Sequence, residues 1–244
     1  MIVITTAMPQ ETDAVLACLE APVTAPGTCQ TWRGNCGATP AMALRTGMGR
    51  EAVTTGLGGV LAAGGAVAVV SAGFAGALTA DLRAGDIVLC EATLADGEEG
   101  RYAADLSLLE RAERAAVAGG LRIVRGTSAT VPETAGPKAK LSLRERTGAE
   151  VCEMEDCWAA RLAAEYGLPF LAVRVVLDEI GTDVSDFAGL AGDEGIRPWR
   201  AVWYFLTHPG RLGAALTSWR QFRTARASLR HFMKNFLVEG ETGR

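Results

Sequence analysis

The chain of 244 residues contains only two histidines, His208 and His231, and both lie beyond residue 200. A histidine-based zinc site, a Ser-His-Asp triad or a Cys-His pair would have to be built there, away from most of the sequence. These classes of site are therefore disfavoured, and we expect neither a metal ion nor a cofactor. Carboxylates remain as the groups on which chemistry would depend.

Long apolar runs and paired cysteine motifs are also missing. The longest apolar stretch, "AVAVVSAGFAGAL", is short and broken by glycines, and the N-terminal residues show no secretory pattern. We therefore expect a cytoplasmic protein. The six cysteines contain no C-x-x-C spacing, so we expect free thiols. With 49% hydrophobic and 21% charged residues, the composition is that of a globular protein.

Charge is distributed unevenly along the chain. Residues 208–237 contain six Lys or Arg and no Asp or Glu, whereas residues 1–207 carry a net charge of −9. An acidic body disfavours nucleic acid as a partner, because phosphate backbones are bound by positive surfaces. The basic segment needs a separate explanation.

Strand-like and helix-like patterns alternate through most of the chain. Strand, helix, strand in this order predicts parallel crossover units and an α/β fold. We predict a catalytic domain over residues 1–190, a three-layer sandwich whose central sheet is mixed, mostly parallel and flanked by helices. A C-terminal amphipathic helical extension would follow over residues 191–244. The pattern places strands at 2–8, 41–49, 66–78, 85–94, 121–131 and 169–178, and helices at 9–20, 50–64, 104–120, 137–148 and 152–167.

The glycine-rich loops do not match a nucleotide-binding fingerprint. In "TGMGREA", Gly47 and Gly49 are followed by Ala52, and no Walker A pattern occurs anywhere in the chain. Two interpretations stay open for such a loop. It is either a tight strand-to-helix turn, or an anion or sugar site at a helix N-terminus.

Four blocks, taken together and in order, resemble the nucleoside phosphorylase and nucleosidase superfamily. A Met-Glu pair followed by a Pro-led strand that ends in Asp is the most specific of them. The resemblance runs from residue 1 to about residue 186. The blocks are "TTAMPQETD", "LRTGMGREA", "SAGFAGALTADLRAGDIVL" and "EMEDCWAARLAAEYGLPFLAVRVVLD".

The resemblance implies a role for each site residue. Asp178 would be the general acid that protonates a purine nitrogen, and Glu11 falls on the position that activates water in the nucleosidase branch. Met154 and Glu155 would bind ribose hydroxyls, and Val131 would read the base through its main chain. The remaining substrate-binding positions implied by the resemblance are Gly73 and Phe74.

The chemistry needs two carboxyl groups in different states. Cleavage of a ribose–adenine bond develops oxocarbenium character on the sugar, and the base leaves well only when protonated. One acid must therefore hold a proton while the other stays ionised, and burial at the end of a strand would keep Asp178 protonated. The competing interpretation makes Glu153 a helix N-terminal charge and Arg174 a buried partner for a carboxylate.

The residues at the phosphate-binding positions of the family favour hydrolysis over phosphorolysis. The phosphorylases that the chain resembles carry two Arg and a Ser where this chain has Glu11, Ser71 and Phe74. Arg45 leaves a route to phosphate open. Leu177 stands where the family has a Ser that orients the acid, which weakens the prediction for Asp178.

The basic segment places bulky apolar residues at helical spacing. It would pack on the domain or a second subunit, or lie on an anionic membrane at the inner face. This segment sets the chain apart from ordinary methylthioadenosine nucleosidases and resembles the hopanoid-associated phosphorylase branch, whose members are implicated in removing adenine from adenosylhopane. The apolar residues are Leu212, Leu216, Trp219, Phe222, Leu229, Phe232, Met233 and Phe236.

Three hypotheses follow. The first is an N-glycosidase that releases adenine from a lipid-linked 5′-substituted adenosine, adenosylhopane, with phosphorolysis as the alternative mechanism. The second is a nucleosidase for methylthioadenosine, S-adenosylhomocysteine or a futalosine-type compound. The third is a nucleoside-binding protein without turnover. In each case family relatives imply a homodimer.

Overall fold

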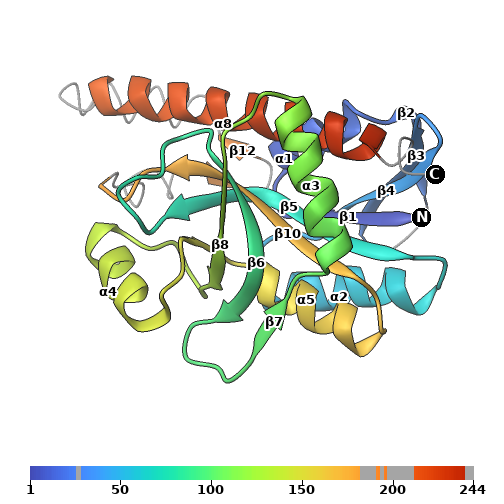
Figure 1. The fold of residues 1–244 in the computed structure, drawn as a ribbon, viewed down its shortest axis with the longest axis horizontal. Helices are drawn as coiled ribbons and strands as arrows, with labels where there is room; N and C mark the ends of the chain where they lie inside the picture. The colour runs from blue at the N-terminus through green and yellow to red at the C-terminus, as the bar shows by residue number, and fades with distance from the viewer. Residues whose placement is uncertain (26–28, 182–190, 193–194, 197–211, 240–244) are drawn as a thin grey trace.

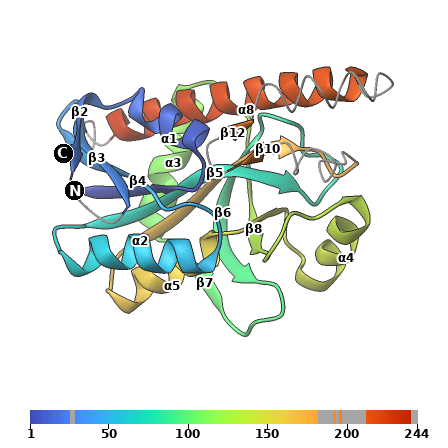
Figure 2. The same ribbon diagram turned by 180° about the vertical axis from the view of Figure 1, so that it is seen from behind.

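The computed structural model describes residues 1–25, 29–181, 191–192, 195–196 and 212–239. A central sheet lies between two layers of helices, and Figures 1 and 2 show the arrangement from opposite sides. Helices α1, α3 and α8 cover one face, α2 and α5 cover the other, and α4 lies beside β8. The α/β sandwich with a mixed central sheet and a C-terminal helix is therefore confirmed. The helices are α1 (Pro9–Leu16), α2 (Arg50–Ala62), α3 (Leu106–Ala118), α4 (Pro137–Thr147), α5 (Asp156–Glu165) and α8 (Leu212–Val238).

The sheet has the order β10-β6-β8-β9-β5-β1-β4-β3-β2, with an additional pairing between β10 and β5. Strands β4, β1, β5 and β10 run parallel, and β6 and β8 form a second parallel pair. Antiparallel pairings join β10 to β6 and β5 to β9. The strands are β1 (Ile2–Thr6), β2 (Glu20–Ala25), β3 (Gln30–Cys36), β4 (Thr39–Arg45), β5 (Ala68–Ala77), β6 (Ile87–Ala95), β7 (Arg101–Ala103), β8 (Ile123–Thr130), β9 (Val151–Glu153), β10 (Phe170–Asp178) and the separate pair β11 (Ala191–Gly192) and β12 (Gly195–Ile196).

The middle strands are buried on both faces, as expected for parallel strands covered by helices. Every residue of β1 and β5 is buried. One apolar core joins side chains of β1, β5 and β10 to α1, α3 and α8, and a second joins the opposite side of the sheet to α2 and α5. The continuous β-branched and small apolar runs in the sequence arise from this double burial.

Helix ends follow the local chemistry of the chain. The Asp105 carboxylate accepts a hydrogen bond from the backbone N–H of Leu108, 3.0 Å away, and begins α3. Gly148 and Gly167, with φ of 68° and 65°, follow α4 and α5 in the left-handed conformation. Both glycines were predicted to end these helices, and both do.

Two predicted helices differ in the structure. The helix from residue 9 ends at Leu16, and the chain then forms the hairpin β2–β3, which the sequence analysis did not assign. A helix was predicted to begin at Cys152, but residues 151–153 form β9, and α5 begins at Asp156. Pairing with β5 and β8 overrides the helical pattern there, because it uses the backbone N–H and C=O groups of the segment.

The C-terminal half of α8 belongs to the core of the domain. Leu229, Phe232, Met233 and Phe236 are fully buried against α1, α3 and β10. The Arg111 guanidinium of α3 donates hydrogen bonds to the carbonyl of Phe236, at 3.0 and 2.7 Å, and so caps the helix end. The alternative in which this face lies on a membrane is therefore wrong for residues 229–236.

The N-terminal half of α8 is different. Trp219 is 56% exposed, and the Arg223 guanidinium lies 4.7 Å from the centre of its ring. The side chains of Leu212 and Leu216 lie outside the described residues, as does His208. Within the described part of the chain, no helix is long and apolar enough to cross a bilayer.

Candidate active site

Glu11 lies at the start of α1, directly after the central strand β1. Its side chain is 2% exposed, and three backbone N–H groups donate to its carboxylate. Ala7 and Met8 bind Oε2 at 2.9 and 2.8 Å, and Phe74 binds Oε1 at 2.7 Å. Burial raises the pKa of Glu11, while the nearby Arg174 and the three backbone hydrogen bonds oppose that rise. The carboxylate is thus held in one orientation by groups that cannot move independently.

Gly73 of β5 creates the space that Glu11 occupies. A Cβ at this position would lie 2.6 Å from Glu11 Oε1 and would also overlap Arg174 Nη1. Any larger residue would push these two groups out of place. The predicted site position Gly73 therefore has a steric reason, close approach of side chains to the strand.

The short strand β9 brings a second set of acids to the same place. Cys152 pairs with Gly76 in antiparallel orientation, so the residues after β9 run back along β5. Glu155 is 8% exposed, and its Oε1 accepts a hydrogen bond from the backbone N–H of Gly49, 2.9 Å away. Burial, opposed by Arg174 and by the Gly49 hydrogen bond, raises the pKa of Glu155 to about 7, and the charge of Glu11 contributes to that rise. Glu11 and Glu155 therefore interact, although 144 positions separate them in the sequence.

Arg174 is the positive centre of this half of the site. It is 2% exposed, its Nε lies 2.9 Å from Asp156 Oδ2, and its Nη2 donates to the other oxygen of Asp156 and to Ser71 Oγ at 2.7 Å. Glu153 Oε2 lies 3.5 Å from Nη2. Arg174 is thus a buried partner for carboxylates, as the competing interpretation held, and Asp156 is its main partner.

Glu153 holds the N-terminus of α5. Its Oε2 accepts hydrogen bonds from the backbone N–H groups of Glu155 and Asp156, at 2.5 and 2.6 Å. Glu153 therefore caps the helix N-terminus as predicted, from a place in β9 rather than in the helix, but its raised pKa makes it a mostly protonated acid near pH 7 rather than a charge. Burial, followed by the charge of Asp156, raises the pKa of Glu153 to about 8.

Asp178 ends β10, next to the carboxyl end of β5. Its side chain is 9% exposed, and Oδ2 forms an ion pair with Lys140 of α4. Burial raises the pKa of Asp178, and Lys140 lowers it. Burial alone was predicted to set the charge of this acid. The buried lysine was not predicted; its one signal in the sequence was its place three residues before the apolar Leu143 on the same helix face.

The other predicted positions lie on β5, after β8 and after β9. Phe74 follows Gly73 and packs edge-on against Phe222 of α8, with ring centres 5.8 Å apart. Val131 donates its backbone N–H to the carbonyl of Glu153 at 2.7 Å, and packs in one apolar group with Met154. Strand β5 connects the two halves of the site.

Glu11 and Asp178 adjoin the same strand. Glu11 contacts the position of Gly73, and Asp178 Oδ2 lies 3.2 Å from where a Cβ of Gly76 would be. Three residues of strand correspond to about 10 Å, and positions 73 and 76 of a regular strand face opposite sides of the sheet. Both acids therefore lie near the carboxyl ends of β1, β5 and β10, the end at which α/β sheets hold their ligands, and they approach β5 from different faces.

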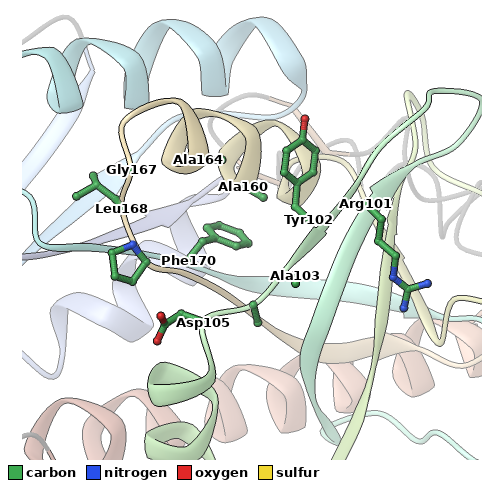
Figure 3. A pocket seen from close by; sticks show the side chains of 11 residues that line it. Arg101, Tyr102, Ala103, Asp105, Ala160, Ala164, Gly167, Leu168 and Phe170 are labelled. Atoms are coloured by element: carbon green, nitrogen blue, oxygen red, sulfur yellow. The ribbon is translucent and has the colours of Figure 1, made fainter.

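A pocket of about 500 Å³ lies elsewhere, between β7, the end of α5 and the start of β10 (Figure 3). Tyr102 and Phe170 line it, and it contains none of the predicted site residues. It lies at the amino end of β10, whereas Asp178 lies at the carboxyl end. Within the described ranges, no three His, Cys, Asp or Glu residues gather as metal ligands would.

Solved structures with a similar fold include two nucleosidases or hydrolases. The methylthioadenosine/S-adenosylhomocysteine nucleosidase of Neisseria meningitidis, solved with methylthio-immucillin-A, matches with a TM-score of 0.77 at 18% identity, over 98% of each chain. The futalosine hydrolase of Helicobacter pylori matches with a TM-score of 0.75 at 17% identity, over 98% of this chain and 97% of that one.

These coverages correct one prediction. The fraction of this chain left outside the Neisseria match is 2%, whereas α8 alone has 27 of the 244 residues. The C-terminal helix therefore has a counterpart in a methylthioadenosine nucleosidase structure. It does not set this chain apart from such enzymes.

Sequence comparison agrees with the fold. A methylthioadenosine/S-adenosylhomocysteine nucleosidase of Geobacillus kaustophilus is 26% identical over 173 residues, which cover 64% of this chain and 74% of that protein. The family profile described as the phosphorylase superfamily matches residues 1–196. This match covers most of the chain and agrees with the observed fold, so the chain belongs to the phosphorylase superfamily.

Proposed function

We propose that this chain hydrolyses the N-glycosidic bond of a 5′-substituted adenosine and releases adenine. The observation that carries the proposal is the Glu11 carboxylate, fixed by three backbone N–H groups and adjacent to Glu155 and Arg174. Such a fixed, buried carboxylate is suited to accept a proton from a single bound water. The related proteins named as nucleosidases and hydrolases support the same reaction.

In the proposed mechanism the two acids act at opposite ends of the broken bond. Asp178 gives a proton to the purine, which leaves with the electron pair of the glycosidic bond. Glu11 takes a proton from water, and the remaining hydroxide adds to the sugar carbon. Glu155 and Met154 would hold the ribose hydroxyls, and the Val131 main chain would contact the base.

Hydrolysis is favoured over phosphorolysis because the available cations are already engaged. Arg174 is bound by Asp156 and Ser71. Arg45 donates a hydrogen bond to Gln30, and its guanidinium lies 5.9 Å from the centre of the Trp32 ring. Glu11 would repel a phosphate at the loop that follows β1.

The test is adenine release from 5′-methylthioadenosine, measured by chromatography with and without inorganic phosphate. We expect release without phosphate. Glu11→Gln and Asp178→Asn should each reduce kcat by about 10²–10⁴-fold, because each removes a proton-transfer group. Glu51→Gln, an exposed acid in the first turn of α2, is the matched control and should keep the wild-type rate. Binding of the nucleoside without any adenine release would favour a non-catalytic protein instead.

The 5′-substituent is a finer proposal. A lipid-linked adenosine such as adenosylhopane has two supports, the contact of Phe74 with Phe222 beside Glu11 and the exposed Trp219 on a basic helix. Methylthioadenosine, S-adenosylhomocysteine and futalosine-type substrates are favoured by the names of the relatives. Comparing kcat/KM for methylthioadenosine with that for a long-chain 5′-alkyl adenosine decides between them. The lipid proposal requires the long-chain compound to be preferred.

Contact with a membrane surface and assembly as a homodimer also stay predictions. Deleting residues 208–237 would remove core side chains such as Phe232, so it would not isolate a membrane effect. Trp219→Ser is a sharper variant, since Trp219 is 56% exposed. Loss of binding to anionic vesicles in this variant would support contact of α8 with a membrane surface. The molar mass in solution, measured by light scattering, tests the homodimer.

A further inference from the structure

Lys140 is a buried cation for which the proposed mechanism so far has no use. It lies in the first half of α4 with 1% of its surface exposed, whereas Lys138, two positions earlier, is exposed. A lysine is seldom fully buried unless its charge is paired, because desolvation of an ammonium is costly. A buried position for this ammonium therefore requires a group of opposite charge beside it.

The partner is the acid of the site. Lys140 Nζ donates to Asp178 Oδ2, and it donates a second hydrogen bond to the carbonyl of Glu179, 3.2 Å away. Gly76 of β5 makes room for this contact, since a Cβ there would lie 3.1 Å from Lys140 Cε and 3.2 Å from Asp178 Oδ2. Two acceptors and one glycine thus fix the ammonium against a single carboxylate oxygen.

Other charged groups near Asp178 are already neutralised or engaged. The Glu179 carboxylate lies 3.6 Å from Arg83, and Asp86, whose carbonyl accepts the backbone N–H of Val176, forms an ion pair with Arg122. Cys152 of β9 is close, and burial raises the pKa of its thiol to about 12. In the described part of the chain, the charged side chain that hydrogen-bonds to the Asp178 carboxylate is Lys140.

The residue before Asp178 is Leu177, whose side chain offers no hydrogen bond donor. Orientation of the acid must therefore come from elsewhere. A charge-assisted hydrogen bond from an ammonium is stronger than one from a neutral donor. The Glu179 carbonyl and the space at Gly76 hold that ammonium in place.

We propose that Lys140 is the positioning residue of the acid, which fixes the Asp178 carboxyl at the end of β5 and sets the pH above which it stops donating its proton. This inference rests on the proposed function, because it assigns Lys140 to the same reaction. Lys140 does not touch the substrate; it acts through Asp178.

The test compares pH profiles of kcat/KM for methylthioadenosine cleavage in the full-length wild type, Lys140→Met and Lys138→Met. Without the ammonium, the buried carboxyl of Asp178 holds its proton more tightly. The alkaline limb of the Lys140→Met profile should therefore move to higher pH by about one unit or more. Its kcat at the optimum should fall about tenfold, the effect of one lost charged hydrogen bond. Lys138→Met should leave both unchanged.

A merely structural lysine gives a different result, with kcat lower at every pH and the alkaline limb unmoved, and that outcome overturns the proposal. A second measurement needs no turnover. The ¹³C carboxyl signal of Asp178, assigned by its loss in Asp178→Asn, is titrated in wild type and in Lys140→Met. An upward shift of the midpoint in Lys140→Met supports the proposal, and an unchanged midpoint overturns it. If no adenine is released even by the wild type, the proposed function fails, while this titration still decides the role of Lys140.

Discussion

The two halves of the candidate site use buried acids in opposite ways. Around Arg174, the acids Glu11, Glu153, Glu155 and Asp156 share one guanidinium, so negative groups are in excess. Around Asp178, one carboxylate faces one ammonium, and the charges balance. The acids and cations of both halves are buried, so the number of acids for each cation distinguishes the halves.

This difference in charge ratio indicates which half supplies the base and which supplies the acid. An excess of buried acids raises the pKa values of all of them. Backbone N–H groups that donate to one carboxylate stabilise its ionised form, so that carboxylate is the one able to accept a proton. A balanced pair instead lets one neighbour set the pKa of one acid. The first arrangement suits a base beside a sugar, and the second suits an acid that must give up one proton.

Removing each cation gives the largest contrast between the halves. Arg174→Met should lower the free energy of unfolding by about 3–5 kcal/mol, because it leaves several buried acids without their cation. Lys140→Met should lower the free energy of unfolding by much less, since the single Asp178 carboxyl can take up a proton and become neutral. Thermal and denaturant unfolding at pH 7 measure both. Equal losses would show that the charge ratio does not distinguish the halves.

Glu155 links the acid-rich half to substrate binding. The ionised carboxylate would accept hydrogen bonds from ribose hydroxyls, and burial raises its pKa to about 7. We therefore expect KM for methylthioadenosine to rise as pH falls through about 7. Glu155→Gln should raise KM about tenfold or more at pH 8 and remove this pH dependence. The exposed Glu165→Gln, at the other end of α5, is the control and should follow the wild-type curve.

Close packing at Gly73 tests the geometry of the same half. Gly73→Ala would bring a methyl group to 2.6 Å from Glu11 Oε1, so it should lower kcat and destabilise the fold by about 1–3 kcal/mol. Gly58→Ala is the matched control, because nothing lies within 4 Å of its Cβ position on α2. It should be neutral or stabilise by up to about 1 kcal/mol. Full activity in Gly73→Ala would mean that the contact with Glu11 is not needed.

The smallest effect concerns pH and stability. Burial raises the pKa of Glu153 to about 8 from an ordinary value of 4.5. Between these values the folded protein binds a proton that the unfolded chain has released, so this stabilising contribution is lost as pH rises toward 8. Tm should therefore fall from pH 5 to 8, and Glu153→Gln should flatten that fall. The exposed Glu133→Gln should not change the slope.

Much of the site could be predicted, but not how its members are held. The motif around Met154 and Asp178 and the loop with Glu11 indicated the acids, and the structure places both beside β5. Lys140 was missed, because a single lysine in a helical pattern is usually solvated. The segment before α5 was predicted as part of a helix, since nothing local shows that residues 151–153 pair with two strands.

The sequence by itself determined the alternation of strands and helices, the glycine stops after α4 and α5, and the preference for carboxylate chemistry, because these depend on local conformation and residue type. Only the tertiary structure decided which face of α8 is buried, which acids share Arg174, and that Lys140 meets Asp178. Those facts depend on long-range strand pairing and on desolvation. Neither is encoded at any one position of the chain.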